Sequence, residues 1–153
     1  MDTAADPTTV VREMAIDASP ETLWELLVDP REMVRWMGLA ATVDLRRGGT
    51  YRVEVIPGHA ASGVFVEIDR PRRLVTTWGW EGHAVVPPGS TTVTFDLEPR
   101  GRGTLLRLTH GGLPTAESIA SHTQGWQHYC ARLTAVAAGA HPGPDPWIDG
   151  PRI

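Results

Sequence analysis

The longest helical pattern in the chain lies near its C-terminal end, over residues 118–139. Residues on one face of this helix recur at steps of three and four: His122, Trp126, Tyr129, Leu133 and Val136. A helix with a single apolar face must bury that face against another element. The rest of the chain therefore has to supply a surface for this helix to cover.

Before this helix the sequence predicts a strand, two short helices and then a series of strands. Residues 9–17 alternate with a period of two, as a strand does. Ser19 followed by Pro20 marks the start of a helix over 19–28, and a second helix is expected over 31–38. Short alternating segments separated by Gly and Pro turns follow at 41–45, 50–55, 63–69, 73–80, 91–98 and 104–110.

Short sequential strands joined by turns favour an antiparallel meander. The predicted fold class is α+β: a curved antiparallel sheet wrapped around the long C-terminal helix, with two short helices between the first two strands. The chain of 153 residues fits one domain, which we place at residues 1–139. Residues 140–153 form a Pro/Gly-rich tail. The largest apolar residue of this tail is Trp147. It could pack on the sheet, pack on a second subunit of a homodimer, or be a loose end, and the sequence does not decide among these.

Composition excludes several classes of function. The formal net charge is −4 and no long basic run occurs, which argues against a nucleic-acid partner. No apolar run approaches the roughly 20 residues of a membrane span. The first ten residues lack the basic and apolar regions of a signal peptide, so a cytoplasmic location is expected. All 14 basic residues are arginines, which excludes a lysine Schiff base and the lysine of a phosphate-binding loop.

We expect neither a metal site nor a cofactor. Cys130 is the single cysteine, so an intrachain disulfide is excluded and a cysteine-based metal site is disfavoured. We expect Cys130 to be buried and to act as a small hydrophobic residue. His122 and His128 lie six positions apart, on different faces of the predicted helix, so they are poorly placed to chelate one ion.

An ordered set of segments carries a resemblance to a known family. These segments are SPETLWELLVDPREMVRWMG, LRRGGTYRVEV, SGVFVEIDRPRRLVTTWGW, GTLLRLTHGGLP and HTQGWQHYCARL. The set, which spans residues 10–138, resembles bacterial homologues of the activator of heat-shock protein 90 ATPase, within the SRPBCC superfamily of START-like domains and polyketide cyclases. The resemblance implies the helix-grip fold, in which a sheet wraps the C-terminal helix around an apolar cavity. It implies no catalytic residue, because the superfamily shares no catalytic motif.

Aromatic and apolar residues on the inferred inner faces are the candidates for lining this cavity. Tryptophan and tyrosine combine a large apolar ring with a polar tip that can orient a ligand. The alternative is that these residues simply fill the core. The predicted ligand-binding residues are Trp36, Tyr51, Val53, Trp78, Trp80, Phe95, Leu108, His110, His122, Trp126, Tyr129 and Leu133.

The candidates for acid–base chemistry are His110, His122 and Tyr129. His110 ends a strand on its inward side, and the other two share the apolar helix face. A histidine of near-neutral pKa can act as an acid or base on a ketone, and a tyrosine can donate to a developing oxyanion. The alternative is that both histidines are hydrogen-bonded without chemistry. A strand register shifted by one residue would instead turn Arg52 and Glu54 inward.

Three functions are consistent with these observations. The first is a non-catalytic protein that binds a small apolar or aromatic ligand, and its signature is a mainly apolar cavity. The second is a cyclase- or aromatase-like enzyme, in which two polar side chains converge within the cavity. The third is a co-chaperone-type interaction domain, which would show little cavity and a large exposed apolar patch. The first is the main expectation. The co-chaperone role ranks lower, because eukaryotic activators carry an additional N-terminal domain with no counterpart in this sequence.

Overall fold

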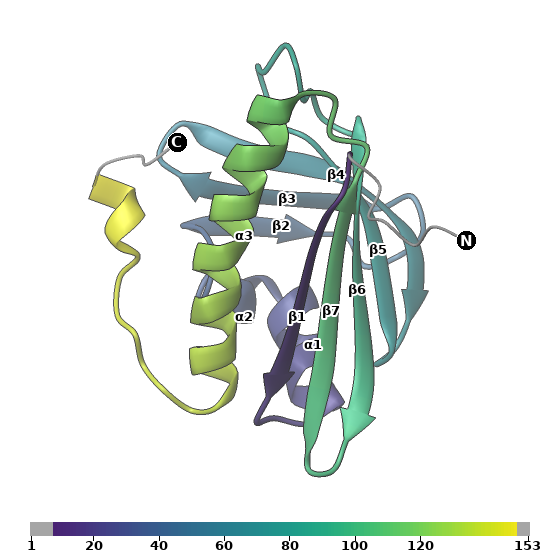
Figure 1. Ribbon diagram of the computed structural model, residues 1–153, viewed down its shortest axis with the longest axis vertical. Coiled ribbons are helices and arrows are strands. Elements are labelled where there is room, and N and C mark those ends of the chain that lie inside the picture. The colour runs from purple at the N-terminus through teal and green to yellow at the C-terminus, as the bar shows by residue number, and fades with distance from the viewer. Residues whose placement is uncertain (1–7, 150–153) are drawn as a thin grey trace.

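The computed structural model describes residues 8–149 and shows a sheet covered by one long helix (Figure 1). The helices are α1 (Pro20–Val28), α2 (Pro30–Met33), α3 (Ala116–Ala137) and the 3-10 turn η1 (Pro146–Asp149). The strands are β1 (Val10–Ile16), β2 (Ala40–Val43), β3 (Thr50–Ile56), β4 (His59–Asp69), β5 (Arg73–Trp78), β6 (Thr91–Arg100) and β7 (Gly103–Gly111). This order confirms the predicted helix-grip arrangement.

The strands form one antiparallel sheet in the order β1-β7-β6-β5-β4-β3-β2. Strands β2 to β7 are a meander, and β1 returns to pair with β7, with Val10 opposite His110. The register shifts between Glu54 and Ile56 and between Phe65 and Glu67. Such irregularities bend a strand, and here they accompany the curvature that gives α3 a concave face to cross (Figure 1).

Helix α3 buries the face that its periodicity predicts. His122, Trp126, Tyr129, Leu133 and Val136 are all buried. The helix begins two residues before the predicted start because Thr115 caps it. The Thr115 side chain accepts a hydrogen bond from the Ser118 backbone N–H, and the Ser118 side chain accepts one from the Thr115 backbone N–H.

Other element boundaries differ from the prediction for local reasons. Helix α2 has only four residues, because the chain turns after Met33 and buries Trp36, whose indole nitrogen donates to the Leu26 carbonyl at 2.8 Å. Strand β4 starts at His59 because residues 57 and 58 form a tight hairpin directly after β3. Strand β5 ends at Trp78, and Trp80 pairs with Ala61 in an isolated bridge.

The inner face of the sheet follows the predicted alternation. On β3 the residues Tyr51, Val53 and Val55 are buried, while Arg52 lies outside and forms an ion pair with Glu81 at 2.8 Å. The one-residue register slip therefore does not occur. On β4 the buried residues are Ala60, Ala61 and Phe65, and the valines on either side of Phe65 are exposed.

Candidate functional site

A cavity of about 680 Å³ lies between α3 and the sheet. Its walls come from the N-terminal half of α3, the hairpin between β3 and β4, the end of β5 and the long loop that follows. Gly79 lets this loop fold back, because a Cβ at position 79 would collide with the Pro87 carbonyl. The cavity is within the range that holds a drug-sized molecule.

Five of the predicted ligand-binding residues line this cavity: Trp78, Trp80, His122, Trp126 and Tyr129. They come from β5, from the residue that bridges to β4, and from α3. Three are indoles packed against one another, with the ring centres of Trp78 and Trp126 5.2 Å apart and those of Trp78 and Trp80 5.6 Å apart. The wall therefore presents large aromatic faces to a ligand.

The other predicted residues are buried in the core and do not line the cavity. Trp36 is buried, and its indole nitrogen donates to the carbonyl of Leu26 in α1. The remaining ones are Tyr51, Val53, Phe95, Leu108, His110 and Leu133. Their alternation and helical spacing indicate the inner face correctly, but the cavity occupies only one end of that face.

His110 is fully buried behind the cavity wall, and both of its ring nitrogens are hydrogen-bonded. The Trp126 indole nitrogen donates to Nδ1 at 2.9 Å, so the ring proton sits on Nε2. Nε2 lies 2.8 Å from the Thr91 hydroxyl, which itself donates to the Trp78 carbonyl at 2.7 Å. The hydroxyl can therefore accept from His110, and the whole chain of bonds is consistent only with a neutral ring.

His122, in the cavity wall, is held in the opposite tautomer. The Trp80 indole nitrogen donates to Nε2 at 3.0 Å, and Nδ1 lies 2.7 Å from the Ser118 carbonyl, which can only accept. The proton is therefore on Nδ1. The two histidine rings lie 4.9 Å apart, edge to face.

This environment keeps both histidines uncharged. Burial, with a smaller contribution from His122, lowers the pKa of His110 from 6.5 to about 3. Burial also lowers the pKa of His122, against the opposing effect of the Ser118 carbonyl. Protonation of either ring would place an N–H opposite the indole N–H that it now accepts from, so neither histidine is free to shuttle protons.

Other polar groups in the wall are also paired within the protein. The Tyr129 hydroxyl donates to Asp145 at 2.6 Å. Burial, and to a smaller extent this hydrogen bond, raises the pKa of Tyr129. Ser118 bonds to the Thr115 backbone, and Ser121 donates to the Ser118 carbonyl. Burial raises the pKa of the neighbouring Cys130 thiol to about 12, so that group is inert.

One buried donor in the wall lacks a partner among the described residues, the Trp78 indole nitrogen. Thr76, two positions earlier on the same face of β5, has a buried hydroxyl that is also unpaired within residues 8–149. Among residues 8–149, the acidic residues that line the cavity are Glu81 and Glu117, and no arginine of this range lines it. The described part of the site therefore offers mainly apolar contact, few free polar groups and neither lysine nor arginine.

Several residues that line the cavity were not predicted from the sequence. The loop after β5 contributes His83, Val85 and Val86, and the C-terminal tail contributes Trp147. The Pro and Gly residues of the loop after β5 predict a long loop, but they do not predict that the loop folds over the cavity. Further lining residues are Met37, Val55, Ile56, Gly58, His59, Gly82, Thr115, Ser118, Ser121 and Gly125.

Gly125 lies in the middle of α3, and the space beside it is open rather than filled by a neighbouring segment. In the structure a Cβ at position 125 meets no described atom within 4 Å, and the residue lines the cavity.

Residues 17–138 match the family described as activator of Hsp90 ATPase homolog 1-like protein. The chain belongs to this family. An AHSA1-like protein of Rhizobium etli, solved in solution, is 48% identical over 91% of this chain and 87% of its own, with a TM-score of 0.73. The family lies within the SRPBCC superfamily, as the resemblance in sequence implied.

Two more distant structures of the same shape bear different names. CalU16 from Micromonospora echinospora is 27% identical over 86% of this chain and 76% of its own, with a TM-score of 0.71. An Hsp90 activator from Plasmodium falciparum is 23% identical over 84% of this chain and 95% of its own, also with a TM-score of 0.71, and shows the fold alone. Among proteins of curated function, none matches this AHSA1-like chain.

Residues 8–149 contain no group of three or more His, Cys, Asp and Glu side chains arranged to hold a metal ion. Within the same range, no helix has the length and apolar character needed to cross a membrane.

Proposed function

We infer that this AHSA1-like protein binds a small, neutral, apolar or aromatic molecule in the cavity between α3 and the sheet. The observation that carries the proposal is a cavity of about 680 Å³ in which most polar side chains of the wall are already hydrogen-bonded to other groups of the protein. A wall of this kind offers a ligand mainly its aromatic faces. Burial of apolar surface against them supplies the binding free energy.

The charge of the wall favours a neutral ligand over an anion. The chain has no lysine, and none of the described residues that line the cavity is an arginine, so these residues offer a carboxylate or sulfonate no guanidinium or ammonium partner. Glu81 and Glu117 would repel it, although Arg52 partly offsets the first. Burying an unpaired charge costs more free energy than apolar contact returns.

Binding is better supported than acid–base catalysis. The polar pair expected of an enzyme is present, since Trp80 and His122 meet at 3.0 Å, but that contact occupies the nitrogen that a base would use. The Tyr129 proton is likewise engaged by Asp145. A catalytic histidine needs a free acceptor and a pKa near the working pH, and neither His110 nor His122 combines the two.

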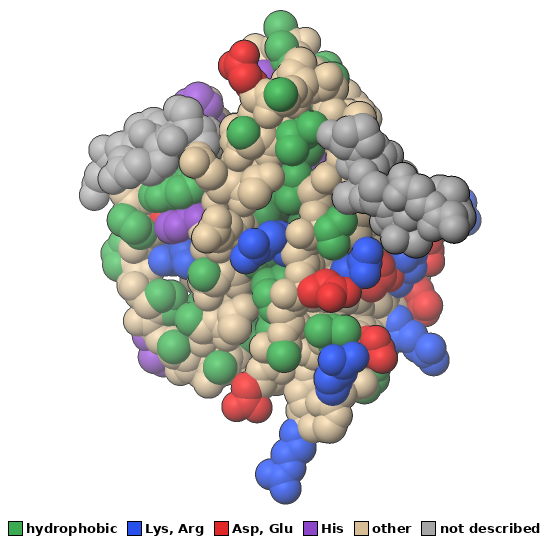
Figure 2. Space-filling view, viewed as in Figure 1, with side chains coloured by type: hydrophobic (Ala, Val, Ile, Leu, Met, Phe, Trp, Pro, Cys, Tyr) green, Lys and Arg blue, Asp and Glu red, His purple; other side chains and the backbone are tan. Residues whose placement is uncertain are grey.

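A co-chaperone interface is also less well supported. On the face shown in Figure 2, hydrophobic side chains lie in small groups among polar and charged ones. The large exposed hydrophobic residues of the described chain are spread over several elements: Val11, Leu39, Leu45, Val64, Val66 and Val85. A partner interface is expected to gather such residues in one patch.

The proposal is tested by filling the cavity from Gly125. Leucine is a better helix former than glycine, and the new side chain enters open space rather than the core. We expect Gly125→Leu to keep or raise the melting temperature and to weaken binding of the neutral probe phenylnaphthylamine by about tenfold or more. Titration of probe fluorescence measures the affinity.

Two controls sharpen this experiment. Ala131→Leu adds the same side chain to an exposed position of α3 and should leave the affinity unchanged. Anilinonaphthalene sulfonate is the same probe with a negative charge, and it should bind the wild-type protein about tenfold more weakly or worse. Equal affinity of Gly125→Leu and wild type for the neutral probe would refute the cavity as the binding site.

A further inference from the structure

The C-terminal tail is attached to α3 through one buried carboxylate. Asp145 is 6% exposed and accepts three hydrogen bonds: from the Tyr129 hydroxyl at 2.6 Å, from His128 Nε2 at 2.7 Å and from the Trp147 backbone at 3.0 Å. Burial alone would raise the pKa of Asp145, but these bonds outweigh it and the pKa is lowered. The carboxylate therefore stays charged and holds the tail at neutral pH.

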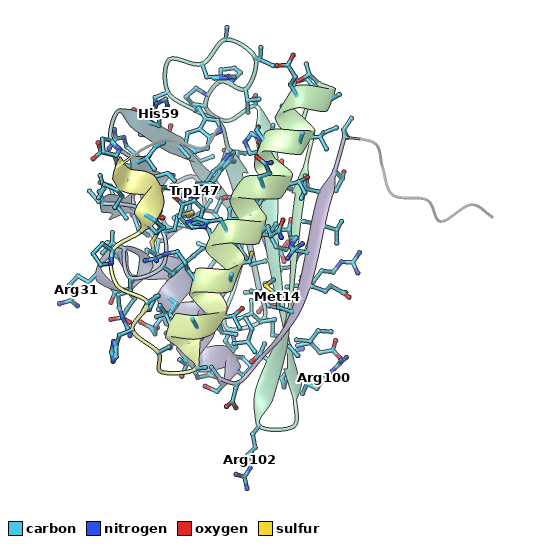
Figure 3. All side chains as sticks on the ribbon, turned by 60° about the vertical axis from the view of Figure 1, so that its left-hand side comes forward. Met14, Arg31, His59, Arg100, Arg102 and Trp147 are labelled. Carbon is cyan, nitrogen blue, oxygen red and sulfur yellow. The ribbon has the colours of Figure 1, made fainter. Side chains whose placement is uncertain are left out.

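This attachment fixes the orientation of Trp147. Its ring stacks flat on His128, with centres 4.0 Å apart and planes 3° apart, and meets Tyr129 edge-on at 5.7 Å. Figure 3 shows Trp147 turned inward from η1 toward α3. Trp147 and Tyr129 both line the cavity, so the tail supplies part of the wall of the binding site.

The tail is held at separate points rather than by continuous packing. Arg132 donates to the Gly143 carbonyl at 2.9 Å and to the Trp36 carbonyl at 3.1 Å, which ties the loop to α3 and to the segment after α2. A second space of about 430 Å³ lies between the loop, α3 and that segment. Because the contact surface is incomplete, the attachment depends strongly on these polar bonds.

We propose that residues 140–148 form a strap that completes the ligand cavity, with Asp145 as its latch and Trp147 as its ligand-contacting residue. The proposal rests on the ligand-binding function inferred above. It adds that ligand affinity and specificity depend on a segment outside residues 17–138, the part of the chain that matches the family. A wall outside the shared domain is free to differ between relatives that keep the same core.

The test uses three variants of the full chain: Asp145→Ala, Trp147→Ala and the double variant. Each single substitution should weaken phenylnaphthylamine binding by about tenfold, the effect of losing roughly 50–60 Å² of apolar contact. Because Asp145 acts by holding Trp147, the double variant should bind no more weakly than either single one. His141→Ala changes an exposed side chain of the same tail and serves as the control.

The outcomes separate this inference from the proposed function. If Trp147→Ala binds within about twofold of wild type while Gly125→Leu has lost affinity, the strap is refuted and the cavity stands. If Gly125→Leu also binds normally, both fail. Additive losses in the double variant would refute Asp145 as the latch. If Asp145→Ala does not fold, Tyr129→Phe removes one of the three bonds, and an affinity unchanged from wild type would then refute the latch.

Discussion

The buried His110 predicts a specific loss of stability in mild acid. Its pKa is lowered from 6.5 to about 3 in the folded state, so the folded ring stays neutral where the unfolded chain takes up a proton. Stability from this group is complete above pH 6.5 and falls as the pH drops toward 3. Each pH unit within that window costs about 1.4 kcal/mol.

Between about pH 7.5 and pH 5, this linkage amounts to about 2 kcal/mol of unfolding free energy. His122 adds to the loss in the same direction, because burial lowers its pKa too. The window lies above the range in which carboxylates take up protons, so histidines dominate the change. Urea unfolding followed by tryptophan fluorescence at the two pH values measures it.

His110→Gln isolates the contribution of this residue. Glutamine offers one acceptor for the Trp126 indole and one donor for the Thr91 hydroxyl, but it does not titrate. The variant should be less stable than wild type at pH 7.5. Between about pH 7.5 and pH 5, its unfolding free energy should fall by about 2 kcal/mol less than that of wild type. His141→Gln, at an exposed site, should behave as wild type. A pH dependence in His110→Gln equal to that of wild type would refute the reasoning.

Two further substitutions test local features of the fold. Gly79→Ala places a Cβ against the Pro87 carbonyl, so the loop must move. The free energy of unfolding, measured in urea, should fall by about 2 kcal/mol or more, and phenylnaphthylamine should bind more weakly. An unchanged stability would contradict the close approach. Thr115→Ala removes the cap of α3 and should cost about 1 kcal/mol, while Thr123→Ala, on the exposed face of that helix, should cost less than half as much. Equal losses would show that the cap contributes nothing.

Local periodicity determined most of the fold. Steps of three and four predict the buried face of α3, and period two predicts the buried residues of β3, β6 and β7, because both patterns follow directly from backbone geometry. Boundaries were less accurate where a side chain decides them, as with Thr115 at the start of α3. The two-residue hairpin before His59 lengthened β4 for a similar local reason.

The site was predictable only in part, because periodicity assigns a residue to a face but not to a depth. Tyr51 and Trp78 both face inward and their rings lie 6.2 Å apart, yet only Trp78 reaches the cavity. Which inner residues touch open space depends on where the sheet curves away from α3. That curvature is a property of all the strands together.

The sequence by itself determined the order of elements, the faces of the strands and of α3, and the family. The tertiary structure alone decided the chemistry of the site. The partner of His122 is Trp80, 42 positions away, and the latch of the tail joins Tyr129 to Asp145. Hydrogen bonds between segments so far apart exist only once the chain has closed on itself, so no local pattern could have shown that the two histidines are neutral and already paired.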